Sequence, residues 1–160
     1  ERVCLGRMVM ASKSDRLSQE DRELVHQMID DELKHLAWME QAAAKYGPKP
    51  DVKASLKECF DDYAAHVAAV EPEVMFAYIY VPERFSGKTL ETFIQMFEER
   101  GDSETAEMLR QVDVDEKRHI KINGRLMRAM MQDPVVGPKV RETCRSMLRS
   151  HYHKHVYAGK

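Results

Sequence analysis

The feature that most restricts the fold is a five-residue pattern that occurs twice, as Asp31-Glu32-Leu33-Lys34-His35 and as Asp115-Glu116-Lys117-Arg118-His119. In each copy the Glu and the His are three residues apart, which on a helix places both side chains on one face, about one turn apart. One helix can then offer a metal an oxygen ligand and a nitrogen ligand together. Two copies predict a two-metal site between two helices.

The Glu-x-x-His spacing alone is weak, because Glu23 and His26 have it as well. The residues that share a helix face with this third pair are polar: Gln19, Glu20, Gln27 and Asp30. The other two pairs lie on apolar stripes, formed by Val25, Met28, Ile29, Leu36 and Met39 and by Leu109, Val112, Ile120, Leu126 and Met127. An ionised Glu is costly to bury unless it is paired or bound to metal. We therefore expect Glu32 and Glu116, and not Glu23, to be buried metal ligands.

Low glycine and proline content predicts an all-α protein, since the chain has only seven Gly and six Pro. Helices are expected over residues 1 to about 12, from Ser18 to Tyr46, from Asp51 to about Val70, from Val74 to Arg100, from Glu104 to about Gln132, and roughly from Lys139 to Tyr157. Ser18 is a good N-cap, and Asp102 can cap the helix that follows Gly101. Pro82 should bend its helix or open a new one. We expect one domain over residues 1–160, with its first helix incomplete.

The two halves of the chain repeat the same arrangement. Glu1 precedes Glu32 by 31 residues, and Glu83 precedes Glu116 by 33. Each interval holds a helix, a short polar turn and a new helix, which predicts two αα-hairpins. Packed face to face, they would bring four carboxylates and two imidazoles to one point. Two divalent ions cancel that charge, and such ligands suit iron or manganese, with zinc as an alternative.

The Asp that opens each pattern has two possible roles. Asp31 and Asp115 can each accept the free ring N–H of a metal-binding His on the facing helix, which would fix its tautomer. Alternatively, each is a surface carboxylate paired with a nearby Lys or Arg.

These motifs resemble the ferritin-like di-iron carboxylate proteins, in particular the oxygenase and ribonucleotide-reductase small-subunit branch. The resemblance covers residues 1 to about 130 and rests on the two Asp-Glu-x-basic-His copies. It implies a ferritin-like four-helix bundle with a long crossover, here with an extra C-terminal helix. It also implies a ligand set in which Glu32 and Glu116 bridge the metals and act in catalysis: Glu1, Glu32, His35, Glu83, Glu116 and His119. Glu73 is a possible substitute for Glu83.

The expected function is an oxidase or oxygenase that activates dioxygen at two iron ions and oxidises a small organic substrate. Because the chain has no flavin, haem or iron–sulfur motif, the electrons would come from an external donor or from the substrate. The alternative is a ferroxidase or iron-storage protein of the ferritin or bacterioferritin kind. A third possibility is a helical scaffold whose buried carboxylates pair with Arg2 and Arg84.

Several residues near Glu83 allow two interpretations. Tyr78 and Tyr80 are either core aromatics, which we favour, or a radical or hydrogen-bonding Tyr beside the metals. Ser86 and Gly87 either leave room for dioxygen or substrate or mark a local helix break. The His-rich stretch 151–155 is expected to be a solvated helix end, and His66 to be structural.

Composition limits the partners and the compartment. The formal charge of −2, from 25 basic and 27 acidic residues, gives no reason to expect nucleic acid as a partner. No apolar run approaches the roughly 20 residues of a membrane span. Cys4, Cys59 and Cys144 form no pair in sequence, which favours a reducing cytoplasm. A homodimer is a possible oligomeric state.

Overall fold

The computed structural model describes the backbone of residues 2–46 and 70–157 and the side chains of residues 4–46 and 70–150. It is all-helical within these ranges, as predicted. Its elements are α1 (Arg2–Ala11), α2 (Gln19–Ala44), the short 3₁₀ helix η1 (Pro72–Val74), α4 (Met75–Glu99), α5 (Ser103–Gln132) and α6 (Gly137–Tyr157). The predicted helix from Asp51 to Val70, His66 and the proposed ligand Glu1 lie outside the described residues, as do the side chains of residues 151–155.

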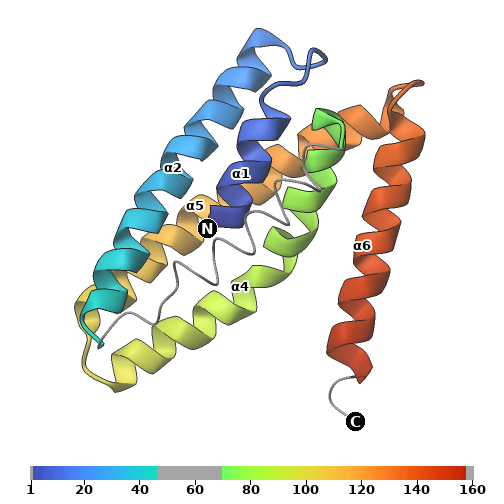
Figure 1. Ribbon diagram of the computed structural model, residues 1–160. Coiled ribbons are helices and arrows are strands. Elements are labelled where there is room, and N and C mark those ends of the chain that lie inside the picture. The colour runs from blue at the N-terminus through green and yellow to red at the C-terminus, as the bar shows by residue number, and fades with distance from the viewer. Residues whose placement is uncertain (1, 47–69, 158–160) are drawn as a thin grey trace.

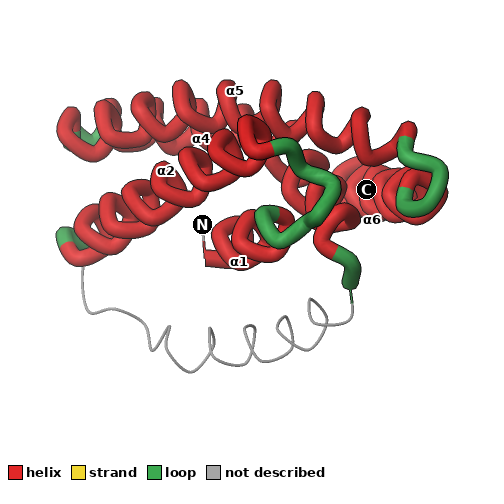
Figure 2. Tube along the Cα trace, turned by 90° about the horizontal axis from the view of Figure 1, so that it is seen from above, coloured by secondary structure: helices red, strands yellow, loops and turns green. Residues whose placement is uncertain are grey.

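The helices pair as two hairpins, as the repeat predicted. Figure 1 shows α1 beside α2 and α4 beside α5, and the second hairpin packs against the first through contacts of α1 with α4 and of α2 with α5. Helix α6 stands at one edge and contacts α4 and α5. Figure 2 shows the same bundle from above, with α5 along one side and α1 on the other. Among the helices in the described ranges, none is long and apolar enough to cross a membrane.

The helix ends follow the expected capping signals. The Ser18 side chain accepts a hydrogen bond from the backbone N–H of Asp21, and the Asp102 side chain accepts one from that of Thr105. Gly101 has a φ of 76°, the left-handed conformation that glycine adopts at a helix C-terminus. One boundary differs from expectation. The sequence predicts that the last helix begins at about Lys139, after Pro138, but α6 begins at Gly137 and includes Pro138 in its first turn. Proline is tolerated there because its missing N–H would have no helical partner.

Helix α4 runs through Pro82 without interruption, so Pro82 does not open a new helix and Ser86-Gly87 does not break one. A proline inside a helix removes the hydrogen bond to the carbonyl four residues earlier, here that of Tyr78. Arg7 of α1 replaces the missing donor, because its Nη1 lies 2.6 Å from the Tyr78 carbonyl oxygen. The proline thus creates an acceptor that fastens α1 to α4 one turn before Glu83.

The packing differs along the length of the bundle. One half is a close-packed apolar core, to which every described α-helix contributes buried residues: Met8, Ala11, Val25, Met28, Phe76, Ile79, Leu126, Met127 and Val140. Tyr78 and Tyr80 are partly buried against this core, which agrees with the structural interpretation of both. Gly124 of α5 lets the Tyr80 ring approach, because a Cβ at Gly124 would lie 2.9 Å from Tyr80 Cε2. The other half contains a large apolar pocket, and the predicted site lies between the two.

Candidate metal centre

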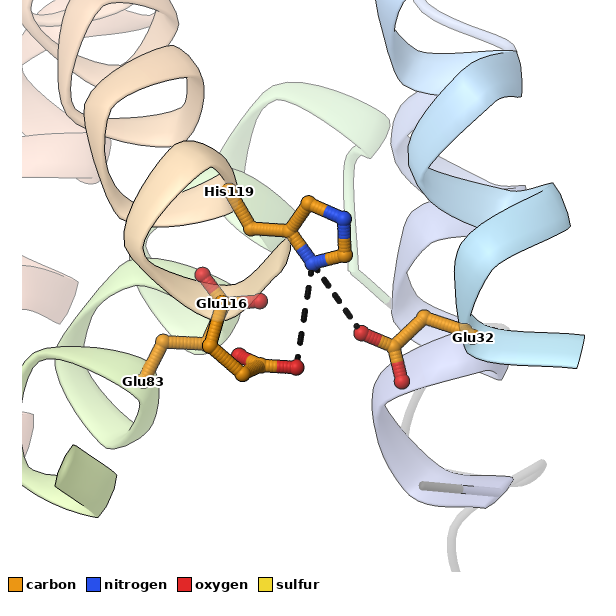
Figure 3. A group of neighbouring side chains, drawn as sticks. All are labelled: Glu32, Glu83, Glu116 and His119. Carbon is orange, nitrogen blue, oxygen red and sulfur yellow. Dashed lines mark ion pairs between the residues drawn. The ribbon is translucent and has the colours of Figure 1, made fainter. Parts of the chain in front are cut away.

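Four of the six predicted ligand residues meet in the middle of the bundle. Glu32 of α2, Glu83 of α4, and Glu116 and His119 of α5 each place one ligand atom within 4.8 Å of the others. Figure 3 shows Glu32 reaching from its helix toward His119, with Glu83 and Glu116 below the imidazole in this view. The four side chains are buried. This cluster could hold a metal ion.

The control pair lies on the wet surface, as its neighbours predicted. Glu23 and His26 are both exposed, and Glu23 accepts a hydrogen bond from the Gln19 side chain at 2.9 Å. By contrast, Glu32 and His35 have no exposed surface. The apolar stripe therefore separates buried from exposed Glu-x-x-His pairs in this chain.

Each imidazole faces a glutamate of the other helix. His119 Nδ1 lies 3.3 Å from Glu32 Oε1 and 3.8 Å from Glu116 Oε1. His35 Nδ1 lies 3.7 Å from Glu116 Oε1. His35 is outside the group of four, but its Nδ1 lies near the same Glu116 oxygen as that of His119. The two helices therefore form a crossed arrangement, which follows from the antiparallel repeat.

The other nitrogen of each imidazole is held by the Asp of the facing helix. His35 Nε2 lies 3.2 Å from Asp115 Oδ2, and His119 Nε2 lies 3.2 Å from Asp31 Oδ2. A carboxylate accepts only, so each Nε2 carries a proton, and in the neutral imidazole Nδ1 then presents a lone pair to the buried carboxylates. This geometry agrees with the first of the two roles expected for these Asp residues.

The second expected role is also seen, since both Asp residues pair with basic side chains. Lys34 Nζ lies 3.1 Å from Asp31 Oδ1 and 2.8 Å from Asp115 Oδ2. Arg118 likewise pairs with both, at 3.1 Å from Asp115 Oδ1 and closer still to Asp31 Oδ2. Partial burial acts to raise the pKa of each Asp, but hydrogen bonds from the facing His and from Lys34 outweigh it and hold both pKa values below the usual range. The two carboxylates thus stay ionised as acceptors.

Glu83 has two partners that the sequence patterns did not indicate. Asn123 Nδ2 donates to Glu83 Oε2 at 2.8 Å, and the Cys4 thiol of α1 donates to Glu83 Oε1 at 3.5 Å. Burial, followed by the negative charge of Glu116, raises the pKa of Glu83 to about 8. Burial and the nearby glutamates also raise the pKa of Cys4, so it stays a protonated donor. Asn123 follows His119 by four residues on the buried face, and that spacing was the available signal.

Glu73 does not substitute for Glu83 in the cluster. It lies in η1, and its Oε1 accepts a hydrogen bond from the Ser14 hydroxyl at 2.5 Å. Both side chains are buried, so the pair ties the turn after α1 to η1. Arg84, which the scaffold alternative paired with the buried carboxylates, is exposed.

An apolar pocket of about 520 Å³ opens directly onto the carboxylates. Glu32, Glu83, Glu116 and Cys4 form one end of it, and Ser86 and Thr89 line it further along α4. Leu90, Phe93 and Phe97 recur at helical spacing as an apolar stripe of α4, and they line this pocket and do not fill a core. Gly87, the other small residue noted in the sequence, is not among the lining residues.

Comparison of the chain with protein families, with curated proteins and with solved structures found no match. The interpretation of the site therefore depends on its own geometry.

Proposed function

We propose that the chain is a ferritin-like di-iron protein that activates dioxygen to oxidise a small organic substrate. The observation that carries the proposal is the orientation of His119. Its Nε2 donates to Asp31, so its Nδ1 lone pair faces carboxylate oxygens 3.3 and 3.8 Å away. A lone pair directed at buried carboxylates is repulsive unless a cation lies between them. A metal ion between them would bind the imidazole lone pair and neutralise the carboxylate charges.

The residues present fit two metals with mixed oxygen and nitrogen ligation. His119 faces Glu32 and Glu116, and His35 faces Glu116 as well. Glu83 joins the same group from α4. By the repeat, Glu1 would complete the set. Iron in such a site supplies the one-electron and dioxygen chemistry that side chains lack. Manganese would suit the same donors.

The remaining side chains orient the ligands and keep the site dry. Asp31 and Asp115 hold the Nε2 protons and so aim both Nδ1 atoms inward, while Lys34 and Arg118 keep the two Asp residues charged. Asn123 and Cys4 fix the carboxylate of Glu83. The apolar pocket offers space for an organic molecule next to the carboxylates. This pocket is the reason to favour an oxygenase over an iron-storage protein.

Iron loading tests the proposal. Purified chain is incubated with ferrous iron without oxygen and desalted, and its iron is assayed; we expect close to two irons per chain. Glu32→Ala and Glu116→Ala should lose this iron, whereas the exposed control Glu23→Ala should keep it. Less than about half an iron per wild-type chain would contradict both the oxygenase and the storage functions. Iron-loaded, reduced protein should then consume dioxygen. Elution from a size-exclusion column as a large oligomer of about 24 subunits would instead favour iron storage.

A further inference from the structure

The pocket beside the carboxylates has a definite direction and length. Its lining residues progress along α2 from Glu32 to Tyr46 and along α4 from Glu83 to Phe97. Each interval is 14 residues, which at 1.5 Å per residue is about 20 Å of helix. On the antiparallel α5 the lining runs back from Glu116 to Thr105. The pocket is therefore elongated along the bundle, from the carboxylates to the turn that joins α4 to α5.

The two ends of the pocket differ in access. At the carboxylate end Glu32, Glu83 and Glu116 are themselves buried, although the neighbouring lining residue Pro82 is exposed. At the other end Ala43 is exposed, and Tyr46 and Phe93 keep 51% and 45% of their surface. A ligand that enters beside Tyr46 and Phe93 would meet the buried carboxylates with its leading end.

The charges around the pocket disfavour an anion. Among the described residues, no Lys, Arg or His lines the pocket, and its carboxylate end holds three glutamates. Near the exposed end Lys45, which lies outside the pocket lining, pairs with Glu104 at 2.6 Å and Asp102 at 3.6 Å. Moving a carboxylate from water to such a place has a large desolvation cost without a compensating partner.

We propose that this pocket binds an uncharged, elongated apolar molecule, such as a long-chain alcohol, with one end against Glu32, Glu83 and Glu116 and the other near Tyr46. That the molecule is the substrate rests on the proposed function; that it binds does not, because the apolar residues that line the pocket are in place without a metal. The reacting position would be the end that enters first.

A second cavity supplies the contrast that the test needs. It adjoins the first pocket at Pro82, Ser86 and Thr89, which line both, and has a volume of about 570 Å³. Residues that line only this second cavity include Arg7, Phe85, Ser146 and Ser150. Because a cation lines this cavity, an anionic amphiphile that binds the chain should prefer it. The two cavities therefore predict opposite preferences for ligands that differ only in charge.

The experiment uses the full chain without iron and the neutral fluorescent probe N-phenyl-1-naphthylamine. We expect saturable binding of one probe per chain, displaced by 1-dodecanol and displaced at least about tenfold more weakly by dodecanoate. Ala43→Phe should weaken probe binding about tenfold by filling the entrance. Ala44→Phe is the matched control, since Ala44 is also exposed on α2 but does not line the pocket, and Ser150→Phe is the control for the second cavity. Circular dichroism establishes that each variant is folded.

A positive charge introduced at the exposed end keeps the inference testable even if Ala43→Phe disturbs the helix. Phe93→Arg should shift the preference toward dodecanoate, whereas Phe85→Arg, equally exposed at 44% but on the second cavity, should leave the alcohol-to-carboxylate ratio of the first pocket unchanged. The inference is overturned if wild-type chain shows no saturable binding, if dodecanoate competes as well as dodecanol, or if Ser150→Phe is the variant that weakens binding. Because these measurements use no iron, failure of the iron-loading test would leave them intact, and the reverse also holds.

Discussion

The two Asp-Glu-x-basic-His segments are alike where they form the buried Glu/His cluster and differ one turn further on. Residues 31–35 and 115–119 each bury a Glu and a His and each offer an Asp to the imidazole of the other. Four residues after the His, however, α5 has Asn123, which is fully buried and donates to Glu83. The equivalent residue of α2 is Met39, which lines the apolar pocket.

This difference shows how a duplicated hairpin can divide its tasks. The ligand positions and the Asp residues repeat because both imidazoles need the same orientation. The position after them is free to differ, since on α5 it faces a carboxylate that needs a donor and on α2 it faces space for a ligand. Both helices contribute to the Glu/His cluster, but α5 also supports Glu83 through Asn123, whereas α2 lines the apolar pocket with Met39.

The largest effect is expected from Glu83→Gln, which removes the carboxylate to which Asn123 of α5 donates a hydrogen bond. Metal content should fall below half of the wild-type value. The free energy of unfolding of the metal-free protein should rise by about 1–3 kcal/mol near pH 8, because a buried carboxylate without its cation is costly. Iron analysis and denaturant unfolding measure the two changes. Glu23→Gln, at an exposed position, should change neither.

The pH profile sharpens this test. The pKa of Glu83 is about 8 in the folded chain and near 4.5 ordinarily, so the folded state binds its proton more tightly than the unfolded state. Its contribution to stability is fully present below about pH 4.5 and is lost as the pH rises through 8. The metal-free wild type should therefore lose stability over this range relative to Glu83→Gln. Parallel profiles of the two proteins would show that Glu83 is not strained by burial.

The next effect tests whether the two halves orient their imidazoles equally. Asp31→Asn and Asp115→Asn each replace an acceptor of a ring N–H with an amide that can present either group, and each should lower metal affinity by about 10- to 100-fold. Competition with a chromophoric chelator gives the affinities. A loss in only one variant would mean that the crossed arrangement is not equivalent on its two sides and that one metal dominates.

The sequence predicted which Glu and His residues are buried, because a charged or polar residue on an apolar stripe can be recognised from the sequence alone. A Glu or His on an apolar stripe contradicts the helix pattern, and this separated Glu32 and Glu116 from Glu23. The repeat also placed Glu83 correctly among the carboxylates, where Glu73 was the alternative. The assignment of two irons, the ferritin-like family and the oxidase activity stay predictions, and Glu1 lies outside the described residues.

The pocket and the supporting residues were beyond sequence reasoning for physical reasons. Leu90, Phe93 and Phe97 form an apolar stripe whether they fill a core or line a cavity, because periodicity reports the face of a helix and not the distance to the next one. Asn123 and Cys4 become partners of Glu83 only once α1 and α5 are packed on α4. Arg7 is similar, since its target carbonyl exists only because Pro82 lies inside a continuous helix.

A reciprocal exchange tests the division of tasks directly. Asn123→Met removes the donor to Glu83 and should lower metal affinity about tenfold, because a buried carboxylate loses a hydrogen bond of a few kcal/mol at most. Met39→Asn should leave metal affinity nearly unchanged but weaken binding of an apolar probe several-fold, because it places an amide in the pocket wall. The same two assays applied to both variants give the comparison. If Met39→Asn lowers metal affinity as much as Asn123→Met does, the two positions share one task and the halves are not specialised.

The smallest effect is expected where the two segments differ in their basic residue. Lys34 and Arg118 each bridge Asp31 and Asp115 at the bundle surface, with 40% and 50% of their side-chain surface exposed. Because water screens such pairs, Lys34→Arg and Arg118→Lys should each change the free energy of unfolding by less than about 1 kcal/mol and metal affinity by no more than about threefold. Lys34→Met with Arg118→Met removes both cations from the two Asp residues, and should raise the pKa of both and cost more than the sum of the single changes. Additive effects of the two Met substitutions, measured as a double-mutant cycle, would show that each cation serves its own Asp and that the crossed network is two independent pairs.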